Sequence, residues 1–356
     1  MKPTFLTQRN RLGVFLVLLA LATSFLAACG GGATAPGSNT AEPAADEVLT
    51  LPEITPLVEG GNRLQVLATT SIIGDVVRQV AGEAIDLVVL MQPGQDPHSY
   101  QPGAADLTAA ADAGVIFING WNLEEGLVDD LVTIGGEALV VPISAGIEPR
   151  EMTGSTTAEG GEARDEAAEE DEDHGHGPLD PHVWQDVNNV ILWVDNVRQV
   201  LSAADPANAA TYAANAERYR AELDQLDAEL TALFEAIPPE RRVLITNHDN
   251  LGYLADSYGF EIIGTIVPSV STLAEPTAAA LAELVNTMQA AGICTLVVET
   301  TASEQLARTL ENELTDCAEV NLITIYTDAL GPAGSGADTY TGMMRANAAA
   351  LVEGLK

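Results

Sequence analysis

From residue 63 onward, short apolar runs alternate with segments of helical period. Four runs are continuous enough to predict buried strands, at 64–68, 86–90, 115–118 and 138–143. Helical stretches separate them, and the first helix is predicted to have Ser71 as its N-cap and to reach Val80. Strands that alternate with helices in this way predict parallel βαβ units.

A single apolar stripe predicts one long helix in the middle of the chain. Residues spaced alternately by four and three form this stripe: Tyr212, Ala216, Tyr219, Leu223, Leu226, Leu230 and Leu233. A helix of about 30 residues spans about 45 Å, which is more than one small lobe needs. We therefore interpret it as a strut that joins two lobes and ends at Pro238-Pro239.

After the strut the alternation resumes. Four further strands are predicted at 242–246, 262–267, 294–298 and 321–326, with a helix at 276–290. The sequence thus predicts an α/β protein with two lobes, each a four-stranded parallel sheet flanked by helices. We place the N-terminal lobe at 62–205, the linking helix within 206–239 and the C-terminal lobe at 240–356.

Residues 150–179 interrupt this pattern. Acidic residues, glycine, serine and threonine crowd the segment, and His174-Gly175-His176-Gly177 closes it. Such a composition cannot bury enough apolar surface to form a core. We predict a disordered acidic loop here.

The N-terminal 61 residues have the pattern of an export signal and a tether. A basic start precedes the apolar stretch 12–28, which is too short for a normal transmembrane helix. It ends in Leu26-Ala27-Ala28-Cys29-Gly30, which resembles a bacterial lipobox, although an ordinary signal peptide with a chance cysteine is the alternative. We expect a lipoprotein signal peptide at 1–28, lipidation of Cys29 and a flexible tether at 29–61. The protein would be exported and lipid-anchored to the cell membrane, or facing the periplasm.

Composition narrows the classes of partner. The formal net charge of −37 argues against nucleic acid, because phosphate binding requires clustered Lys and Arg. It leaves cations open as ligands, although a solvated acidic surface is the simpler interpretation. Cys294 and Cys317 remain once Cys29 is set aside, so export predicts one disulfide between them, with two buried free thiols as the alternative.

The scarce histidines stand where predicted strands end. The chain has only five, and His98, His182 and His248 each follow a strand of the predicted sheets, as does Asp328. Ligands of open parallel sheets bind at the carboxyl ends of the strands. Three imidazoles and one carboxylate form a complete tetrahedral set for Zn²⁺ and a usable one for Mn²⁺. Spacing alone leaves capping or surface roles for these side chains equally open, and Glu299 and Asp249 compete for the fourth position.

Two of the three histidines share the tripeptide Asp-Pro-His. The proline before His98 and before His182 restricts the backbone, so a ligand on this turn loses less entropy on binding. Asp96 and Asp180, two residues upstream, are candidates for hydrogen bonds that orient the imidazoles.

Four motifs, D-P-H-S-Y-Q-P, D-P-H-V-W, N-H-D-N-L-G-Y-L and T-D-A-L-G, resemble those of the zinc/manganese solute-binding proteins of ABC transporters. The resemblance covers 62–354 and implies that His98, His182, His248 and Asp328 bind metal in a cleft between two lobes joined by a rigid helix. An acidic, histidine-containing loop is typical of the zinc members, although this one has only two histidines. The manganese branch tends to have Glu where this chain has His248, which favours zinc.

The resemblance implies an extracytoplasmic solute-binding component of an ABC importer. It would capture Zn²⁺, or Mn²⁺, and deliver it to a membrane permease driven by an ATPase; we expect a monomer. A surface adhesin or metal-storage lipoprotein is the alternative. A zinc hydrolase fits less well, because the chain lacks H-E-x-x-H and a fourth ligand would close the site to water. We therefore do not expect an enzyme.

Overall fold

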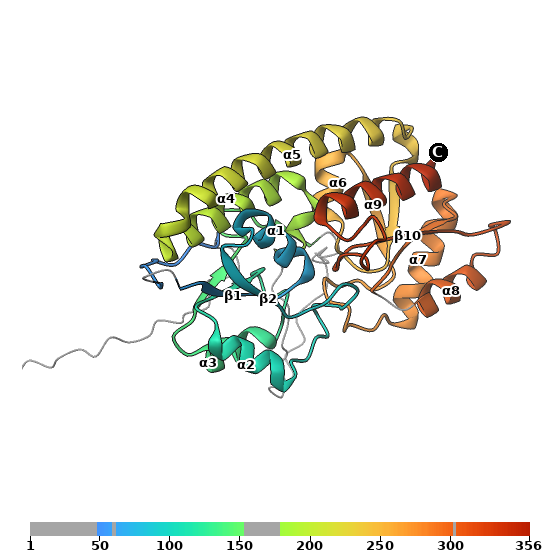
Figure 1. The fold of residues 1–356 in the computed structure, drawn as a ribbon. Coiled ribbons are helices and arrows are strands. Elements are labelled where there is room, and N and C mark those ends of the chain that lie inside the picture. The colour runs from blue at the N-terminus through green and yellow to red at the C-terminus, as the bar shows by residue number, and fades with distance from the viewer. Residues whose placement is uncertain (1–47, 59–61, 153–178, 302–303) are drawn as a thin grey trace, which may run out of the picture. The chain divides into compact units, whose positions relative to one another are not determined.

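The structure is a computed structural model that describes residues 48–58, 62–152, 179–301 and 304–356 (Figure 1). Residues 43–356 form one compact unit, to which all the features below belong. The predicted signal peptide, Cys29, His174 and His176 lie outside the described residues. Within the described residues, no helix is long and apolar enough to cross a membrane.

The first lobe contains the predicted four-stranded parallel sheet. Its strands are β1 (Leu64–Ala68), β2 (Ile85–Val89), β3 (Val115–Ile118) and β4 (Leu139–Pro142), in the order β2-β1-β3-β4. Helices cover both faces of this sheet. Successive side chains of a strand point to opposite sides, so neighbouring residues pack against different helices. Val66 packs in the cluster that includes α1 (Ser71–Ala81), whereas Leu67 packs with α2 (Ala104–Asp112) and α3 (Leu127–Gly135).

The N-cap of α1 differs from the prediction by one residue. Thr70 Oγ1 accepts from the Ile73 backbone N–H at 3.2 Å and caps the helix. Ser71 Oγ instead accepts from the Leu330 backbone N–H at 3.1 Å. Both residue types cap helices well, so the local sequence did not distinguish them.

The second lobe contains the other four predicted strands. They are β7 (Val243–Thr246), β8 (Glu261–Thr265), β9 (Thr295–Glu299) and β10 (Asn321–Ile325). They are hydrogen-bonded as two parallel pairs, β7 with β8 and β9 with β10, and β7 lies beside β9. The helices of this lobe are α6 (Gly252–Tyr258), α7 (Ala278–Ala291), α8 (Glu304–Glu313) and α9 (Tyr340–Leu355).

The predicted long helix is α5 (Ala209–Glu235), which follows α4 (Val187–Ala204) and packs along it (Figure 1). It contacts α1 of the first lobe and α6 and α9 of the second. Six of the seven stripe residues are buried, but Leu233 is only half-buried and Phe234 takes its place. The reason is that a seven-residue spacing drifts by about 20° per two turns of an α-helix.

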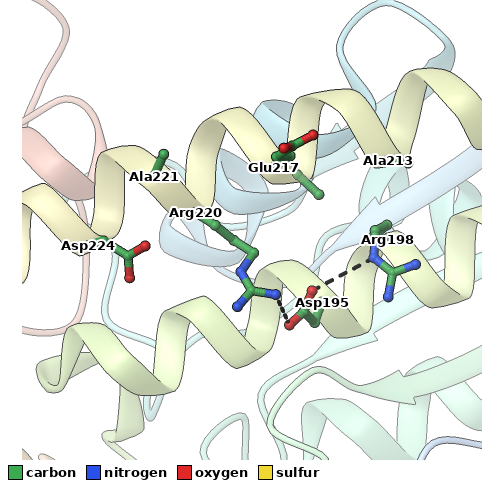
Figure 2. Close-up of a pocket in the computed structure, with 8 residues that line it drawn as sticks. Asp195, Arg198, Ala213, Glu217, Arg220, Ala221 and Asp224 are labelled. Carbon is green, nitrogen blue, oxygen red and sulfur yellow. Dashed lines mark hydrogen bonds and ion pairs between the residues drawn. The ribbon is translucent and has the colours of Figure 1, made fainter.

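Charged residues line the groove between α4 and α5 (Figure 2). Arg220 Nη1 lies 2.7 Å from Asp195 Oδ2, and Arg198 Nε lies 3.7 Å from Asp195 Oδ1. The groove has a volume of about 390 Å³ and contains none of the predicted ligands. Exposed ion pairs of this kind contribute at most about 1 kcal/mol, so the helix pair is held mainly by its apolar stripe.

The end of the predicted tether belongs to the folded unit, which corrects its boundary. Leu51, Ile54 and Val58 pack against the main core. The Leu57 backbone N–H donates to the Ala204 carbonyl at 2.8 Å. The partners in these contacts lie far from 48–58 along the chain. The segment itself is apolar, with six Val, Leu and Ile residues and no glycine, but the prediction grouped it with the Gly- and Pro-containing residues before it.

Two short strands lie at the ends of the predicted acidic loop. β5 (Arg150–Glu151) pairs antiparallel with β6 (Leu179–Asp180), so these end residues are ordered into a ladder rather than disordered. The remainder, 153–178, lies outside the described residues. The predicted bridge between Cys294 and Cys317 is present, with a Cα–Cα distance of 5.8 Å, and it joins the start of β9 to the segment after α8.

Candidate metal centre

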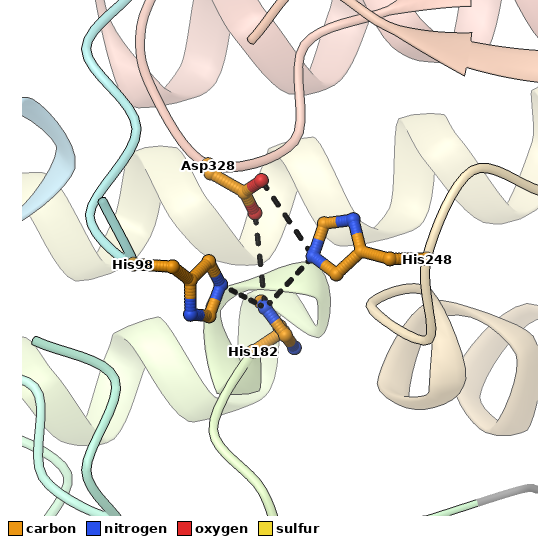
Figure 3. Close-up of side chains that lie close together, drawn as sticks. All are labelled: His98, His182, His248 and Asp328. Carbon is orange, nitrogen blue, oxygen red and sulfur yellow. Dashed lines mark hydrogen bonds and ion pairs between the residues drawn. The ribbon is translucent and has the colours of Figure 1, made fainter. Parts of the chain in front are cut away.

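The four predicted ligands converge on one buried point (Figure 3). Each offers one ligand atom, and these atoms all lie within 4.8 Å of one another. His98 follows β2, His182 stands between β6 and the 3₁₀ turn Val183–Gln185, His248 follows β7 and Asp328 follows β10. Loops at strand ends of both lobes therefore supply the cluster.

The spacing of the donor atoms fits a small divalent cation. His182 Nε2 lies 3.3 Å from His98 Nε2 and 3.4 Å from His248 Nε2. Asp328 Oδ1 and Oδ2 lie 3.8 Å from the Nε2 atoms of His182 and His248 respectively. Zn–N bonds of about 2.0–2.1 Å in a tetrahedron place nitrogens about 3.3–3.4 Å apart. The two nitrogen separations around His182 match this value, and the two distances to the carboxylate oxygens are about half an ångström longer.

Asp180 holds His182 in the way that the Asp-Pro-His motif predicted. Its Oδ1 accepts from the His182 backbone N–H at 3.0 Å and lies 2.8 Å from His182 Nδ1. The carboxylate thus contacts both the backbone N–H and the ring of the residue two positions after it, across the intervening proline. This contact keeps the Nδ1 proton in place and leaves Nε2 for the metal.

Asp96 acts differently on His98. Its Oδ1 accepts from the His98 backbone N–H at 3.0 Å, which repeats the motif. The ring, however, is contacted by Glu125, whose Oε1 lies 3.5 Å from His98 Nδ1. The sequence did not single out Glu125, which lies in the loop after β3.

Glu299 lies behind His248 and not among the four ligands. Its Oε1 lies 2.8 Å from His248 Nδ1 and accepts from the His248 backbone N–H at 3.2 Å. The other competitor for the fourth position, Asp249, is buried but outside the four-residue cluster. A glutamate at the end of a buried strand was the one available signal, and the sequence could not tell a ligand from a supporting carboxylate.

Burial and neighbouring charges set the protonation of the metal-free site. Burial, together with the neighbouring imidazoles, holds the pKa of His182 well below its ordinary value. Burial also acts to lower the pKa of His248, but Glu299 and Asp328 outweigh it and raise that pKa to about 9. Burial raises the pKa of Asp328 to about 6 and that of Asp180 to about 6. At neutral pH an incoming cation therefore displaces a proton from His248.

These features define the class of the protein. A buried set of three imidazoles and one carboxylate satisfies a tetrahedral cation, whereas catalytic zinc keeps an open position for water. The two α/β lobes present this set from their strand ends, as open-sheet binding proteins do. The fold and the site are those of a metal-binding receptor rather than an enzyme.

Comparison with known proteins gives the family. Residues 66–354 match the family described as zinc-uptake complex component A, periplasmic, and the chain belongs to this family of metal-binding components of ABC transporters. The manganese-binding lipoprotein MntA of Halalkalibacterium halodurans is 32% identical over 304 residues, which are 85% of this chain and 92% of that protein. The iron ABC transporter substrate-binding lipoprotein MtsA of Streptococcus pyogenes is 29% identical over 301 residues, covering 83% and 89%.

Among solved structures, the periplasmic zinc-binding protein TroA of Treponema pallidum superposes with a TM-score of 0.69. It is 29% identical, and the match covers 83% of this chain and 99% of that one. The names of these three proteins mention manganese, iron and zinc. Family membership therefore establishes a metal-binding component without choosing the ion.

Proposed function

We propose that this protein captures Zn²⁺ in preference to Mn²⁺ through His98, His182, His248 and Asp328. The observation that supports the proposal is the buried set of three imidazoles, in which His182 Nε2 lies 3.3 and 3.4 Å from the Nε2 atoms of His98 and His248. Mn²⁺ prefers more oxygen donors and more ligands, and it lies below Zn²⁺ in the general affinity order. His248 supplies a third imidazole where the manganese branch tends to have Glu, and this nitrogen donor adds to the preference for zinc over manganese.

The bound ion would be handed to a membrane permease driven by an ATPase. The relatives' descriptions as ABC transporter components support this partnership. The chain would work outside the cytoplasm as a monomer, held at the membrane by a lipid on Cys29. The adhesin or storage alternative differs in one measurable respect, because it predicts that zinc uptake does not depend on this protein.

The test for the ion compares affinities in the soluble form that begins after Cys29. Competition with chelators should show tighter binding of Zn²⁺ than of Mn²⁺. Changing His98, His182 or His248 singly to Ala should each weaken zinc binding strongly, whereas His176→Ala, which removes a histidine outside the proposed set, should leave it unchanged. Tighter manganese binding by the unmodified protein would overturn the choice of ion.

The contribution of the third imidazole can be isolated at His248. His248→Glu should narrow the gap between the two ions by replacing a nitrogen donor with oxygen. The new carboxylate would face Glu299, which lies 2.8 Å from the present ring. The double variant His248→Glu/Glu299→Gln therefore separates the donor effect from repulsion between the two carboxylates. If the gap stays unchanged in both variants, His248 does not set selectivity.

A further inference from the structure

Two hydrogen bonds near the metal centre join segments that lie far apart in the sequence. Ser271 Oγ donates to Glu125 Oε1 at 2.8 Å, and Thr272 Oγ1 donates to Asp96 Oδ2 at 2.6 Å. The donors lie on the loop between β8 and α7, in the second lobe. The acceptors belong to the first lobe, so this pair of bonds spans the two lobes.

Both acceptors also hold the same ligand. Asp96 uses its other oxygen, Oδ1, for the His98 backbone N–H at 3.0 Å. Glu125 Oε1 lies 3.5 Å from His98 Nδ1. One hydroxyl of the second lobe therefore acts on the backbone of His98 through Asp96, and the other acts on its ring through Glu125.

The loop that carries the donors is also tied to the strand end that presents His248. The Val267 backbone N–H donates to the Asn247 carbonyl at 2.8 Å, and the Asp249 backbone N–H donates to the Ser269 carbonyl at 2.9 Å. These two bonds flank His248 on either side. Segment 267–273 thus links the support of His98 in one lobe to the backbone around His248 in the other.

The loop that carries Glu125 is held in an uncommon conformation. Trp121, Asn122 and Glu125 have positive φ angles of 48°, 58° and 41°. Next to them, the buried Glu124 accepts from Thr69 Oγ1 at 2.7 Å and from the Asn119 backbone N–H at 2.6 Å. Backbone conformations of this kind persist where the surroundings fix them and cluster at functional sites. Here the anchored Glu124 fixes the loop, and Glu125 is directed at His98.

The donor loop also borders the approach to the site. A cavity of about 540 Å³ reaches His98, and its lining includes Ser99, Glu125 and Leu273. Leu273, directly after Thr272, is 56% exposed. Movement of the loop would therefore change both the support of His98 and the wall of this cavity.

We propose that Ser271 and Thr272 are positioning residues for His98, which latch the second lobe to the first and slow release of the bound ion. The proposal rests on the proposed function in one respect, namely that His98 is a ligand. Both hydroxyls act through carboxylates that do not themselves belong to the ligand set, so their loss should leave the set intact while loosening it. The effect should therefore fall on dissociation more than on association.

The experiment measures zinc release from the soluble protein into excess chelator by stopped flow. The variant Ser271→Ala/Thr272→Val removes both donors with little change in volume. We expect release to accelerate about 10–100-fold, the range found for partners that support metal ligands. The association rate should stay within about twofold, because most such effects appear in dissociation. Thr309→Val, which removes an exposed hydroxyl that bonds within α8, is the matched control.

Two further variants separate positioning from a merely structural role. The single variant Thr272→Ser keeps both Ser271 and a hydroxyl at position 272. It should therefore release zinc as slowly as the unmodified protein. Ser271→Ala should add little once Glu125→Ala has been introduced, because the Ser271 hydroxyl has then lost the carboxylate through which it acts on His98. If the double variant releases zinc at the unmodified rate while His98→Ala abolishes tight binding, the latch is wrong and the site stands. If His98→Ala also leaves binding unchanged, the proposed function fails with it.

Discussion

At the scale of single residues, the centre consists of three pairs, each an imidazole supported by a carboxylate. Asp180 supports His182, Glu299 supports His248 and Glu125 lies against His98. A carboxylate on Nδ1 fixes the ring orientation and keeps Nε2 directed at the metal. The supports are unequal, since the first two lie at 2.8 Å and the third at 3.5 Å. His98 is therefore the ligand with the loosest support on its ring.

The support of His248 can be tested by the change Glu299→Gln. The amide cannot stabilise the imidazole as a carboxylate does, so zinc affinity should fall about 10–100-fold. Competition with a chelator measures this loss. Glu261→Gln, an exposed glutamate on β8 of the same lobe, is the control and should bind like the unmodified protein. Equal affinity of all three proteins would show that Glu299 does not support the ligand.

The raised pKa of His248 makes zinc binding depend on pH well above the usual range of histidine. Because that pKa is about 9, the metal-free protein holds a proton that zinc must displace at any lower pH. Affinity should fall about tenfold for each pH unit below 9, from one proton released per ion. It should fall more steeply below about 6, where Asp328 is also protonated in the metal-free protein.

Calorimetry in two buffers of different ionisation enthalpy counts the released protons. We expect about one near pH 8 and a larger number near pH 5.5, because Asp328 then contributes. In Glu299→Gln the imidazolium loses a partner, so fewer protons should be released near pH 8. An affinity that does not change between pH 5 and 8 would contradict the three-histidine site.

At the scale of elements, α5 is the part that packs on both lobes. It contacts α1 and α4 of the first lobe and α6 and α9 of the second. The ligands, in contrast, stand on loops beyond the ends of strands, where backbone conformation is free to suit the site. The strands and α5 therefore fix where the loops begin, and local bonds such as that of Asp180 fix where each side chain points.

The burial of the apolar stripe of α5 predicts that two similar substitutions lower the free energy of unfolding by different amounts. Leu226 is fully buried, so Leu226→Ala should lower the free energy of unfolding by about 2–5 kcal/mol. Leu233 belongs to the same sequence pattern but is only half-buried, so Leu233→Ala should cost clearly less. Urea unfolding of the metal-free protein measures both. Equal losses would mean that the drift of the stripe toward Phe234 is not real.

At the scale of the whole folded unit, hydrogen bonds between residues outside α5 also join the lobes. Trp184 Nε1 donates to the Thr327 carbonyl at 2.7 Å, directly before Asp328. Tyr340 Oη donates to the Trp184 carbonyl at 2.8 Å, and the Tyr340 backbone N–H donates to Asp75 Oδ2 at 2.9 Å. The side chain of Trp184, two residues after His182, is thus bonded to the backbone next to Asp328. This bond connects the segments that carry two ligands from different lobes.

Deletion of 153–176 should leave this unit and its centre intact. The deletion spares β5 and β6, whose pairing places Asp180 behind His182. Zinc affinity and the unfolding midpoint should therefore match those of the full chain, with loss only of weak binding by His174 and His176. A longer deletion that also removes Arg150 and Glu151 is the comparison, and it should weaken zinc binding. Unfolding of the shorter deletion would contradict the loop prediction.

Local patterns determined most of the elements and the identity of the candidate ligands. Strand and helix periods depend on residues within one or two turns, so β1 and β3 were predicted to the residue. In the tripeptide Asp-Pro-His, the aspartate that orients the histidine lies only two residues before it. The contact of Asp180 with His182 could therefore be predicted from the sequence. The family resemblance supplied what spacing left open, namely the choice of Asp328 over Glu299.

Only the tertiary structure decided the contacts made across long stretches of chain. Glu299 lies 51 residues from His248, and Ser271 lies 146 residues from Glu125. No local period connects such pairs, because their approach depends on how β7 lies beside β9 and how the two lobes meet. The packing of 48–58 was not predicted either, because its partners also lie far away along the chain. The sequence by itself determined which side chains could bind a metal, and long-range packing decided which carboxylates from other parts of the chain support them.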